Sequence, residues 1–204
     1  GGGGGADGAA ETKDADLDAA TPMPGDFRKP IFAANIVGFG LPATVLGTAN
    51  DLRCCGSAQY NLAAYLSLIK NKSYAATVEF PDEGAPDGWR EMPLVMLQGQ
   101  ASIHMGEKMP FCPRAKVDDG LLDLVAIKHG SRGALIGVME DAKNGKHIDH
   151  TDDTVYVQTK EYVLRPAEAL TGENTINVDG ELIGFSPCRV RAVPRAVRIF
   201  TAPE

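Results

Sequence analysis

A short acidic cluster holds residue types that could bind a metal ion. Between Cys112 and Leu124, the residues Asp118, Asp119 and Asp123 surround Gly120. Carboxylate and carbonyl oxygens gathered on a tight turn are the ligands that a hard divalent cation prefers. The same Asp-Gly pair is also a common hairpin turn signal, in which case Asp118 and Asp123 are only solvated flanks. The spacing alone favours the turn, and the residues leave both interpretations open.

A second acidic cluster, also centred on an Asp-Gly pair, lies near the end of the chain. Residues 177–182 contain an apolar stretch, an Asp179-Gly180 pair and then Glu181. A carboxylate held on a turn can take a proton from a substrate hydroxyl as that hydroxyl attacks a phosphoryl group. A β-hairpin without any catalytic role is again the alternative.

Other polar residues offer weaker signals. Arg53 is either a solvated helix residue or, because a guanidinium is planar, a clamp for phosphate. His147 and His150 follow the end of a predicted helix and have no third metal ligand beside them. We therefore expect these histidines at the surface or at the entry of a strand.

Most of the chain is predicted to form short β-strands. Residues 30–40 are apolar, β-prone and punctuated by glycine, which predicts a buried strand that ends in a loop. The other strands are predicted at residues 76–80, 92–97, 121–127, 154–158, 162–164, 175–178, 188–193 and 196–201. So many short strands favour a mainly β, α+β fold: an antiparallel β-sandwich with inserted helices.

Two helices are predicted within this β-rich pattern. The first closes near residue 71, and its apolar positions recur at helical spacing: Leu62, Tyr65, Leu66 and Ile69. This face either lines a lipid pocket or belongs to the core. The second helix is predicted over residues 132–143, with Gly145 as its cap.

Composition sets the domain boundaries and excludes some functions. Residues 1–28 are rich in Gly, Ala and Asp and predict a disordered linker or insertion, and residues 29–204 are predicted to form one domain. The net charge of -7 argues against a nucleic-acid-binding protein. No apolar run is long enough to cross a membrane. The four cysteines lack zinc spacing, so we expect reduced thiols in the cytoplasm. The opening glycine run, without an initiator methionine, favours a fragment of a longer protein.

Five segments, taken in order, resemble a known family. They are Asn35–Gly40, Arg53–Tyr60, Ala115–Leu124, Gly145–His147 and Val178–Glu181. Their order and spacing are similar to the carboxy-terminal domain of sphingosine and ceramide kinases, which are relatives of the diacylglycerol kinases and of YegS-like bacterial lipid kinases. This resemblance implies the β-rich lobe of the two-lobed NAD kinase and diacylglycerol kinase architecture. The other lobe binds ATP through a Gly-Gly-Asp-Gly-Thr loop that this sequence lacks, and the active site lies between the lobes.

The resemblance also implies roles for individual residues. Asp119 would organise a Mg²⁺ site, to which Lys116 and Leu121 contribute backbone carbonyls. Glu181 matches the proposed general base, and Asp179 belongs to the same catalytic motif. Arg53 matches an arginine that approaches the nucleotide phosphates.

The implied function is that of one half of an ATP-dependent lipid kinase, cytoplasmic and in peripheral contact with a membrane. Its acceptor would be the primary hydroxyl of a sphingoid base or a ceramide-like lipid. Sphingosine and ceramide kinases carry an acidic residue shortly after the glycine loop, where this sequence reads residues 42–46 as Pro-Ala-Thr-Val-Leu. Diacylglycerol therefore remains an alternative acceptor, and a non-catalytic lipid-binding module remains an alternative function.

Overall fold

The computed structural model describes residues 30–81, 89, 93–106, 109–167, 176–183 and 187–198. The chain divides into two compact units, Gly1–Ile31 and Phe32–Glu204. Every helix and strand described below lies in the second unit. The predicted linker, residues 1–28, lies outside the described residues, so its disorder stays a prediction.

Two antiparallel sheets form the centre of the second unit. The larger sheet has the strand order β5-β4-β3-β1-β7-β8, and the smaller has the order β2-β6-β9. The strands of the larger sheet, in that order, are Thr154–Thr159, Leu122–Lys128, Leu94–Gln100, Ile36–Gly40, Ile176–Val178 and Glu181–Ile183. Those of the smaller sheet are Ala76–Glu79, Glu161–Pro166 and Cys188–Arg191. The predicted β-sandwich is confirmed.

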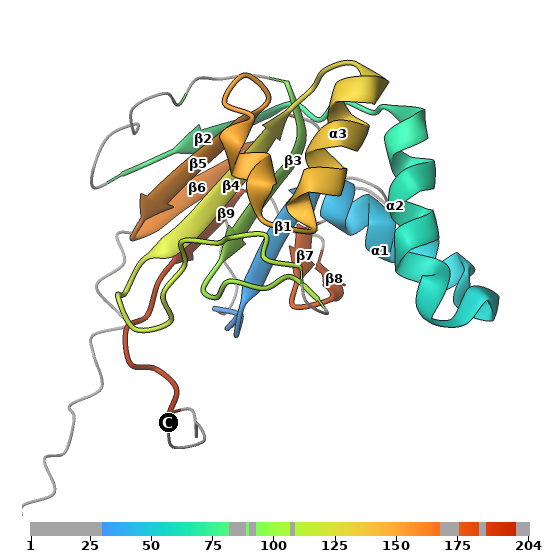
Figure 1. The fold of residues 1–204 in the computed structure, drawn as a ribbon. Helices are drawn as coiled ribbons and strands as arrows, with labels where there is room; N and C mark the ends of the chain where they lie inside the picture. The colour runs from blue at the N-terminus through green and yellow to red at the C-terminus, as the bar shows by residue number, and fades with distance from the viewer. Residues whose placement is uncertain are drawn as a thin grey trace, which may run out of the picture. The chain divides into compact units, whose positions relative to one another are not determined.

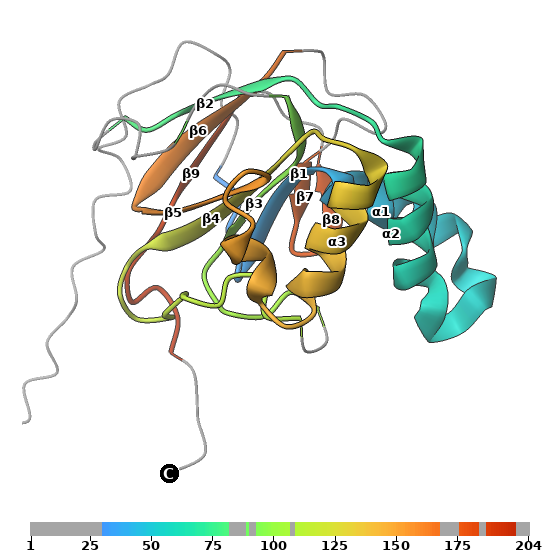
Figure 2. The ribbon, with the colours of Figure 1, turned by 45° about the horizontal axis from the view of Figure 1, so that its top comes forward.

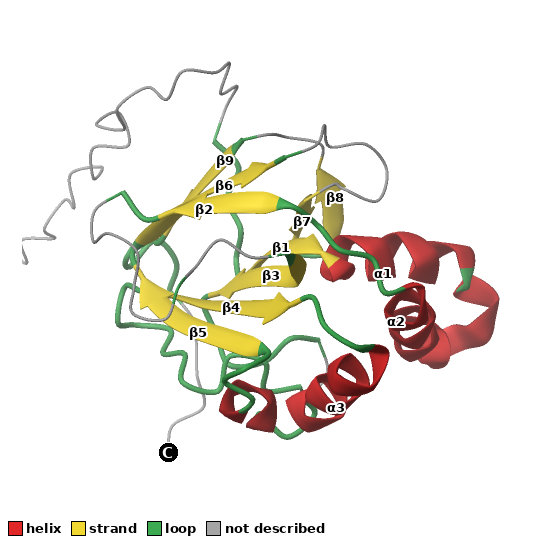
Figure 3. Ribbon diagram, turned by 90° about the horizontal axis from the view of Figure 1, so that it is seen from above, coloured by secondary structure: helices red, strands yellow, loops and turns green. Residues whose placement is uncertain are grey.

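Helices α1 (Leu41–Asp51) and α3 (Arg132–Ala142) cover the face of the larger sheet that points away from the smaller one (Figure 3). Helix α2 (Gln59–Lys70) packs against α1 and α3. Two short 3₁₀ helices, η1 (Arg53–Ala58) and η2 (Lys146–Asp149), follow α1 and α3 along the chain. In the described part of the chain, no helix has both the length and the apolar character needed to cross a membrane.

A close-packed core joins the two sheets. Alternate residues of the facing strands, such as Phe39, Leu124 and Leu164, are buried between them. Tyr162 of β6 lies directly over Gly99 of β3, where an added Cβ would come within 2.7 Å of the tyrosine oxygen. The glycine therefore permits the close approach of the sheets at this point.

A second apolar cluster joins the larger sheet to the helices and to the long connection between β3 and β4. Its buried members include Met96, Val125, Leu135 and Val138. Residues 101–121 form the connection, and Figures 1 and 2 show it at the end of the sheet where β3 ends and β4 begins. Phe111 and Cys112 of this connection are completely buried.

The structure corrects several expectations about helices and strands. Helix α1 was not predicted, although Pro42 in its first turn is a common helix start signal. The core interpretation of the apolar face of α2 is wrong, because that helix buries Ala63, Ser67 and Leu68 instead. Its four predicted core side chains are exposed: Leu62, Tyr65, Leu66 and Ile69. The strand predicted at residues 196–201 is absent from its described part, residues 196–198.

Candidate active site

The turn that carries Glu181 is a tight hairpin, as the sequence predicted. Val178 of β7 pairs with Glu181 of β8, so only Asp179 and Gly180 connect the two strands. Both have positive φ, 48° and 93°, which is the conformation that a two-residue hairpin of this twist requires. The side chain of Asn177 accepts a hydrogen bond from the Gly180 amide at 2.9 Å. The Glu181 side chain is exposed and projects from this hydrogen-bonded hairpin.

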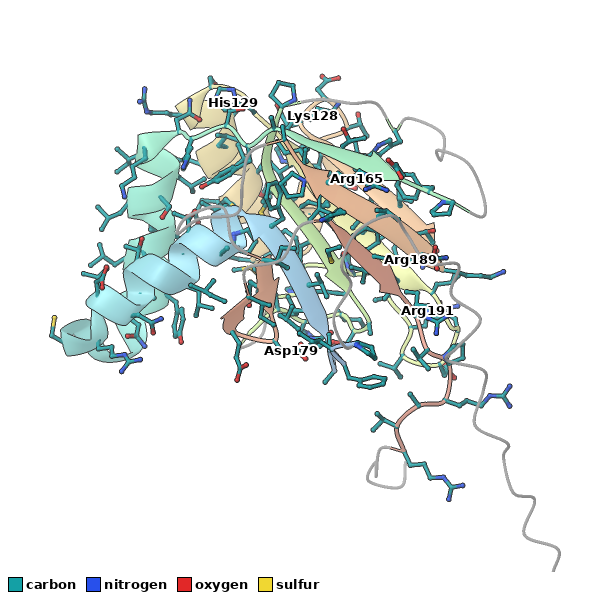
Figure 4. All side chains as sticks on the ribbon, turned by 180° about the vertical axis from the view of Figure 1, so that it is seen from behind. Lys128, His129, Arg165, Asp179, Arg189 and Arg191 are labelled. Atoms are coloured by element: carbon teal, nitrogen blue, oxygen red, sulfur yellow. The ribbon has the colours of Figure 1, made fainter. Side chains whose placement is uncertain are left out.

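Asp179 has a structural role that the sequence did not reveal. Its carboxylate accepts backbone N–H groups from Ala34, from Asn35 at 3.0 Å and from Ile36 at 2.7 Å. Figure 4 shows the side chain at the end of the sheet where β1 starts, opposite to the end that carries Lys128 and His129. Asp179 thus attaches the β7–β8 turn to the start of β1.

The second acidic turn is part of the long β3–β4 connection and not a two-residue hairpin. Gly120 has a φ of 74°, and the Asp119 carboxylate accepts the amide of Leu121 at 2.9 Å. The side chains of Lys116 and Asp119 are exposed. An added Cβ at Gly120 would lie 3.2 Å from Pro194, so this turn also contacts the segment after β9.

The donor set of this turn suits a weakly held Mg²⁺. The described residues contain no group of three His, Cys, Asp or Glu side chains that could hold a metal ion. Magnesium, however, keeps several waters and is commonly bound by one or two carboxylates together with substrate phosphates. The exposed Asp119 carboxylate offers one such ligand, and the resemblance assigns the carbonyls of Lys116 and Leu121 as further oxygens. This set would not fit a cation that demands a complete protein cage.

Asp123 is not a solvated flank, which corrects the hairpin interpretation. The side chain is completely buried on β4. Its Oδ1 atom accepts hydrogen bonds from the hydroxyl of Tyr156 and, at 3.1 Å, from Nε2 of Gln158. Burial raises the pKa of the Asp123 carboxyl, and the two hydrogen bonds oppose that rise.

His147 is also buried, although a surface or strand-entry position was predicted. It belongs to η2, just before β5, and its ring stacks on Phe111 with 4.6 Å between ring centroids. Its Nε2 lies 3.0 Å from the Phe111 carbonyl and donates to it. Burial lowers the pKa of His147, so the neutral ring is favoured. His150 pairs with Asp141 at 2.7 Å.

The structure brings the two acidic turns to one end of the larger sheet. The pairing registers place the starts of β1 and β4 and the ends of β3 and β7 at this end. Strands β3 and β1 lie between the two turns. Arg53 is not part of either turn. It follows α1, a helix that begins at the opposite end of β1. Its exposed side chain donates to Asn50 at 3.2 Å, a local contact.

This architecture is the β-sandwich lobe of the NAD-kinase-like class. A family model described as the YegS C-terminal NAD kinase beta sandwich-like domain matches residues 35–201. The chain therefore belongs to this family, whose relatives include lipid kinases.

Individual relatives agree with the family assignment. The chain is 28% identical over 170 residues to a probable lipid kinase YegS-like of Chromohalobacter salexigens, covering 82% of this chain and 50% of the relative. It is 31% identical over 100 residues to sphingosine kinase 2 of Arabidopsis thaliana, covering 47% of this chain and 21% of that protein. The chain thus spans 50% of the length of the bacterial relative and 21% of the length of the plant protein.

A solved structure confirms the fold. The crystal structure of a putative diacylglycerol kinase from Bacillus anthracis aligns with a TM-score of 0.56 at 21% identity, covering 78% of this chain and 50% of that chain.

Proposed function

We propose that this chain is the acceptor-binding lobe of an ATP-dependent lipid kinase, whose nucleotide is bound mainly by another lobe. The observation that carries the proposal is the position of Glu181, exposed on a hydrogen-bonded hairpin at the same end of the sheet as the Asp119 turn. Phosphoryl transfer needs a base near the attacking hydroxyl and a cation near the phosphates. The kinase names of the bacterial and plant relatives support the same activity.

Each candidate residue has one task in this proposal. Glu181 accepts the proton of the lipid hydroxyl, and Asp179 holds the turn from which Glu181 projects. The carboxylate of Asp119 and the carbonyls of Lys116 and Leu121 bind Mg²⁺, which when bound offsets negative charge on the phosphates. Arg53 lies apart from the two acidic turns and contacts Asn50, so its proposed role as a phosphate clamp depends on the resemblance alone.

The exposed face of α2 supports a lipid as the acceptor. Its large apolar side chains remain substantially exposed to solvent: Leu62 41%, Tyr65 39%, Leu66 40% and Ile69 57%. Several large apolar side chains exposed on one helix are typical of a binding face. We propose that this face shelters the hydrocarbon chain of a sphingoid base or ceramide-like lipid, at a peripheral contact with a cytoplasmic membrane surface.

Diacylglycerol is a second candidate acceptor, for a specific reason. The position where sphingosine and ceramide kinases carry an acidic residue falls in the first turns of α1. There Thr44 is buried and shares a hydrogen bond of 2.6 Å with the hydroxyl of Tyr74. No carboxylate in the described residues 41–46 meets the polar head of the lipid. An acceptor with a neutral glycerol head would suit this environment.

The test is phosphate transfer from labelled ATP to sphingosine, ceramide and diacylglycerol. Residues 1–204 joined to a nucleotide-binding lobe should phosphorylate one of these lipids in a Mg²⁺-dependent reaction. Residues 1–204 alone should bind ATP weakly and transfer no phosphate, because this sequence lacks the Gly-Gly-Asp-Gly-Thr loop through which the resemblance implies that ATP binds. Lipid binding without transfer by the joined protein would favour the non-catalytic module instead.

A further inference from the structure

A row of polar side chains crosses the larger sheet next to the β3–β4 connection: Gln100 and Asp123 are buried, and Gln158 is exposed. The resemblance assigns no role to these side chains. Asp123 of β4 stands between Gln100 of β3 and Gln158 of β5 in the sheet register. Its Oδ1 atom accepts the Tyr156 hydroxyl and the Gln158 amide, and its buried Oδ2 atom has no hydrogen-bond partner in the protein. A carboxyl in this setting is costly to bury, so a purely structural site would be better served by an apolar residue.

The Tyr156 hydroxyl connects this row to the connection above it. It accepts the backbone N–H of Arg114 at 3.3 Å, and the Arg114 guanidinium lies 5.2 Å from the centre of the same ring. The thiol of Cys112 donates to the Asp123 carbonyl at 3.5 Å. Cys112 and Arg114 are thus attached to the sheet immediately before the exposed turn begins at Lys116.

We propose that Asp123 and Tyr156 are positioning residues for the Lys116–Leu121 turn, a role that rests on the cation-binding function proposed above. Leu121 directly precedes β4, which begins at Leu122, so that end of the turn is fixed by the sheet. Its other end is fixed through Arg114, and Asp123 orients the hydroxyl that holds Arg114. Without that hydroxyl the turn samples more conformations, and the Lys116 carbonyl and Asp119 carboxylate are in binding geometry for a smaller fraction of the time. The apparent cation affinity falls by that fraction.

The experiment titrates Mn²⁺, a paramagnetic substitute for Mg²⁺, into residues 1–204 and follows the amide NMR signals of residues 116–121. Tyr156→Phe keeps the ring and removes only the hydroxyl. It should raise the Mn²⁺ concentration for half-maximal broadening by about three- to tenfold, the change expected from one neutral hydrogen bond. Asp123→Asn should shift it in the same direction. The matched control is Thr154→Val, which removes a buried hydroxyl without a partner from the same strand and should change nothing.

Enzymatic data separate positioning from general destabilisation. In the protein joined to its nucleotide lobe, Tyr156→Phe should raise the Mg²⁺ concentration for half-maximal turnover by a similar factor, while turnover at saturating Mg²⁺ returns to the wild-type value. A structural defect alone would lower turnover at every Mg²⁺ concentration, which would overturn the positioning role.

Asp119→Asn distinguishes the two levels of the proposal. If Asp119→Asn weakens the broadening while Tyr156→Phe and Asp123→Asn retain wild-type affinity, the cation site stands and the positioning role is wrong. If the wild-type protein shows no selective broadening of residues 116–121, the cation site and the positioning role both fail.

Discussion

Replacing Asp179 tests whether one carboxylate holds the start of β1. Three backbone N–H groups, from Ala34, Asn35 and Ile36, donate to it. The turn is exposed, so water can replace part of what is lost, and we take about 1 kcal/mol for each bond, below the range for charged partners. Asp179→Gly should therefore lower the free energy of unfolding by roughly 2–3 kcal/mol, since glycine tolerates the φ of 48°.

Two further variants separate the hydrogen bonds from the backbone conformation. Asp179→Ala should lose about 1 kcal/mol more than Asp179→Gly, because alanine is strained in the left-handed region. Asp179→Asn keeps an acceptor and tolerates that region, so it should lose only about 1 kcal/mol. As a control, the exposed Asp118 replaced by Ala should stay within about 0.5 kcal/mol of the wild type.

The assay is urea unfolding of residues 1–204, with amide hydrogen exchange of residues 34–36 as a local measurement. Exchange at these amides should accelerate in Asp179→Gly. An unfolding free energy for Asp179→Gly within about 0.5 kcal/mol of the wild type would refute the reasoning, because it would show that water replaces the carboxylate without cost.

Three other predictions concern activity and pH. In the protein joined to its nucleotide lobe, Glu181→Gln should cut turnover by roughly two to four orders of magnitude and leave the nucleotide affinity unchanged. A variant that keeps more than about a tenth of the wild-type turnover would remove Glu181 from the mechanism. Leu66→Trp should alter the preferred acyl-chain length with little change in melting temperature, since Leu66 is already 40% exposed; an unchanged preference would count against lipid contact. The folded-state pKa of His147 is lowered, so the unfolded chain binds more protons, and the free energy of unfolding should fall as pH drops from about 7 to about 5. His147→Gln should make this pH dependence weaker. An equally steep pH dependence in the variant would assign it to other groups.

Local sequence patterns predicted the elements whose determinants are local. The Asp179-Gly180 pair indicates a two-residue hairpin because the two residues tolerate positive φ, and the structure has that hairpin. Helix α3 was predicted from its spacing and begins after Ser131, whose hydroxyl accepts the Ala134 amide. The number of short predicted strands likewise indicated the β-sandwich.

Features that depend on distant partners were missed. The burial of Asp123 follows from Tyr156 and Gln158, which reach it from the neighbouring strand and not from its own segment. Periodicity showed that α2 is a helix but not which face is buried: small Ala63 and Ser67 allow close packing, while the larger apolar residues face outward. Helical spacing cannot distinguish a core from an exposed binding stripe.

The position of β1 has a consequence for how the chain folds. The earliest strand of the described residues, β1, lies inside the larger sheet, between β3 and the late strand β7. Its start is held by Asp179 across separations of 143 to 145 residues. Contacts that distant form slowly, because the entropy of closing the intervening chain is lost before they stabilise anything. During synthesis, β1 therefore keeps one edge unpaired until Ile176–Val178 has left the ribosome, and a chain that stops earlier exposes a strand edge open to intermolecular pairing.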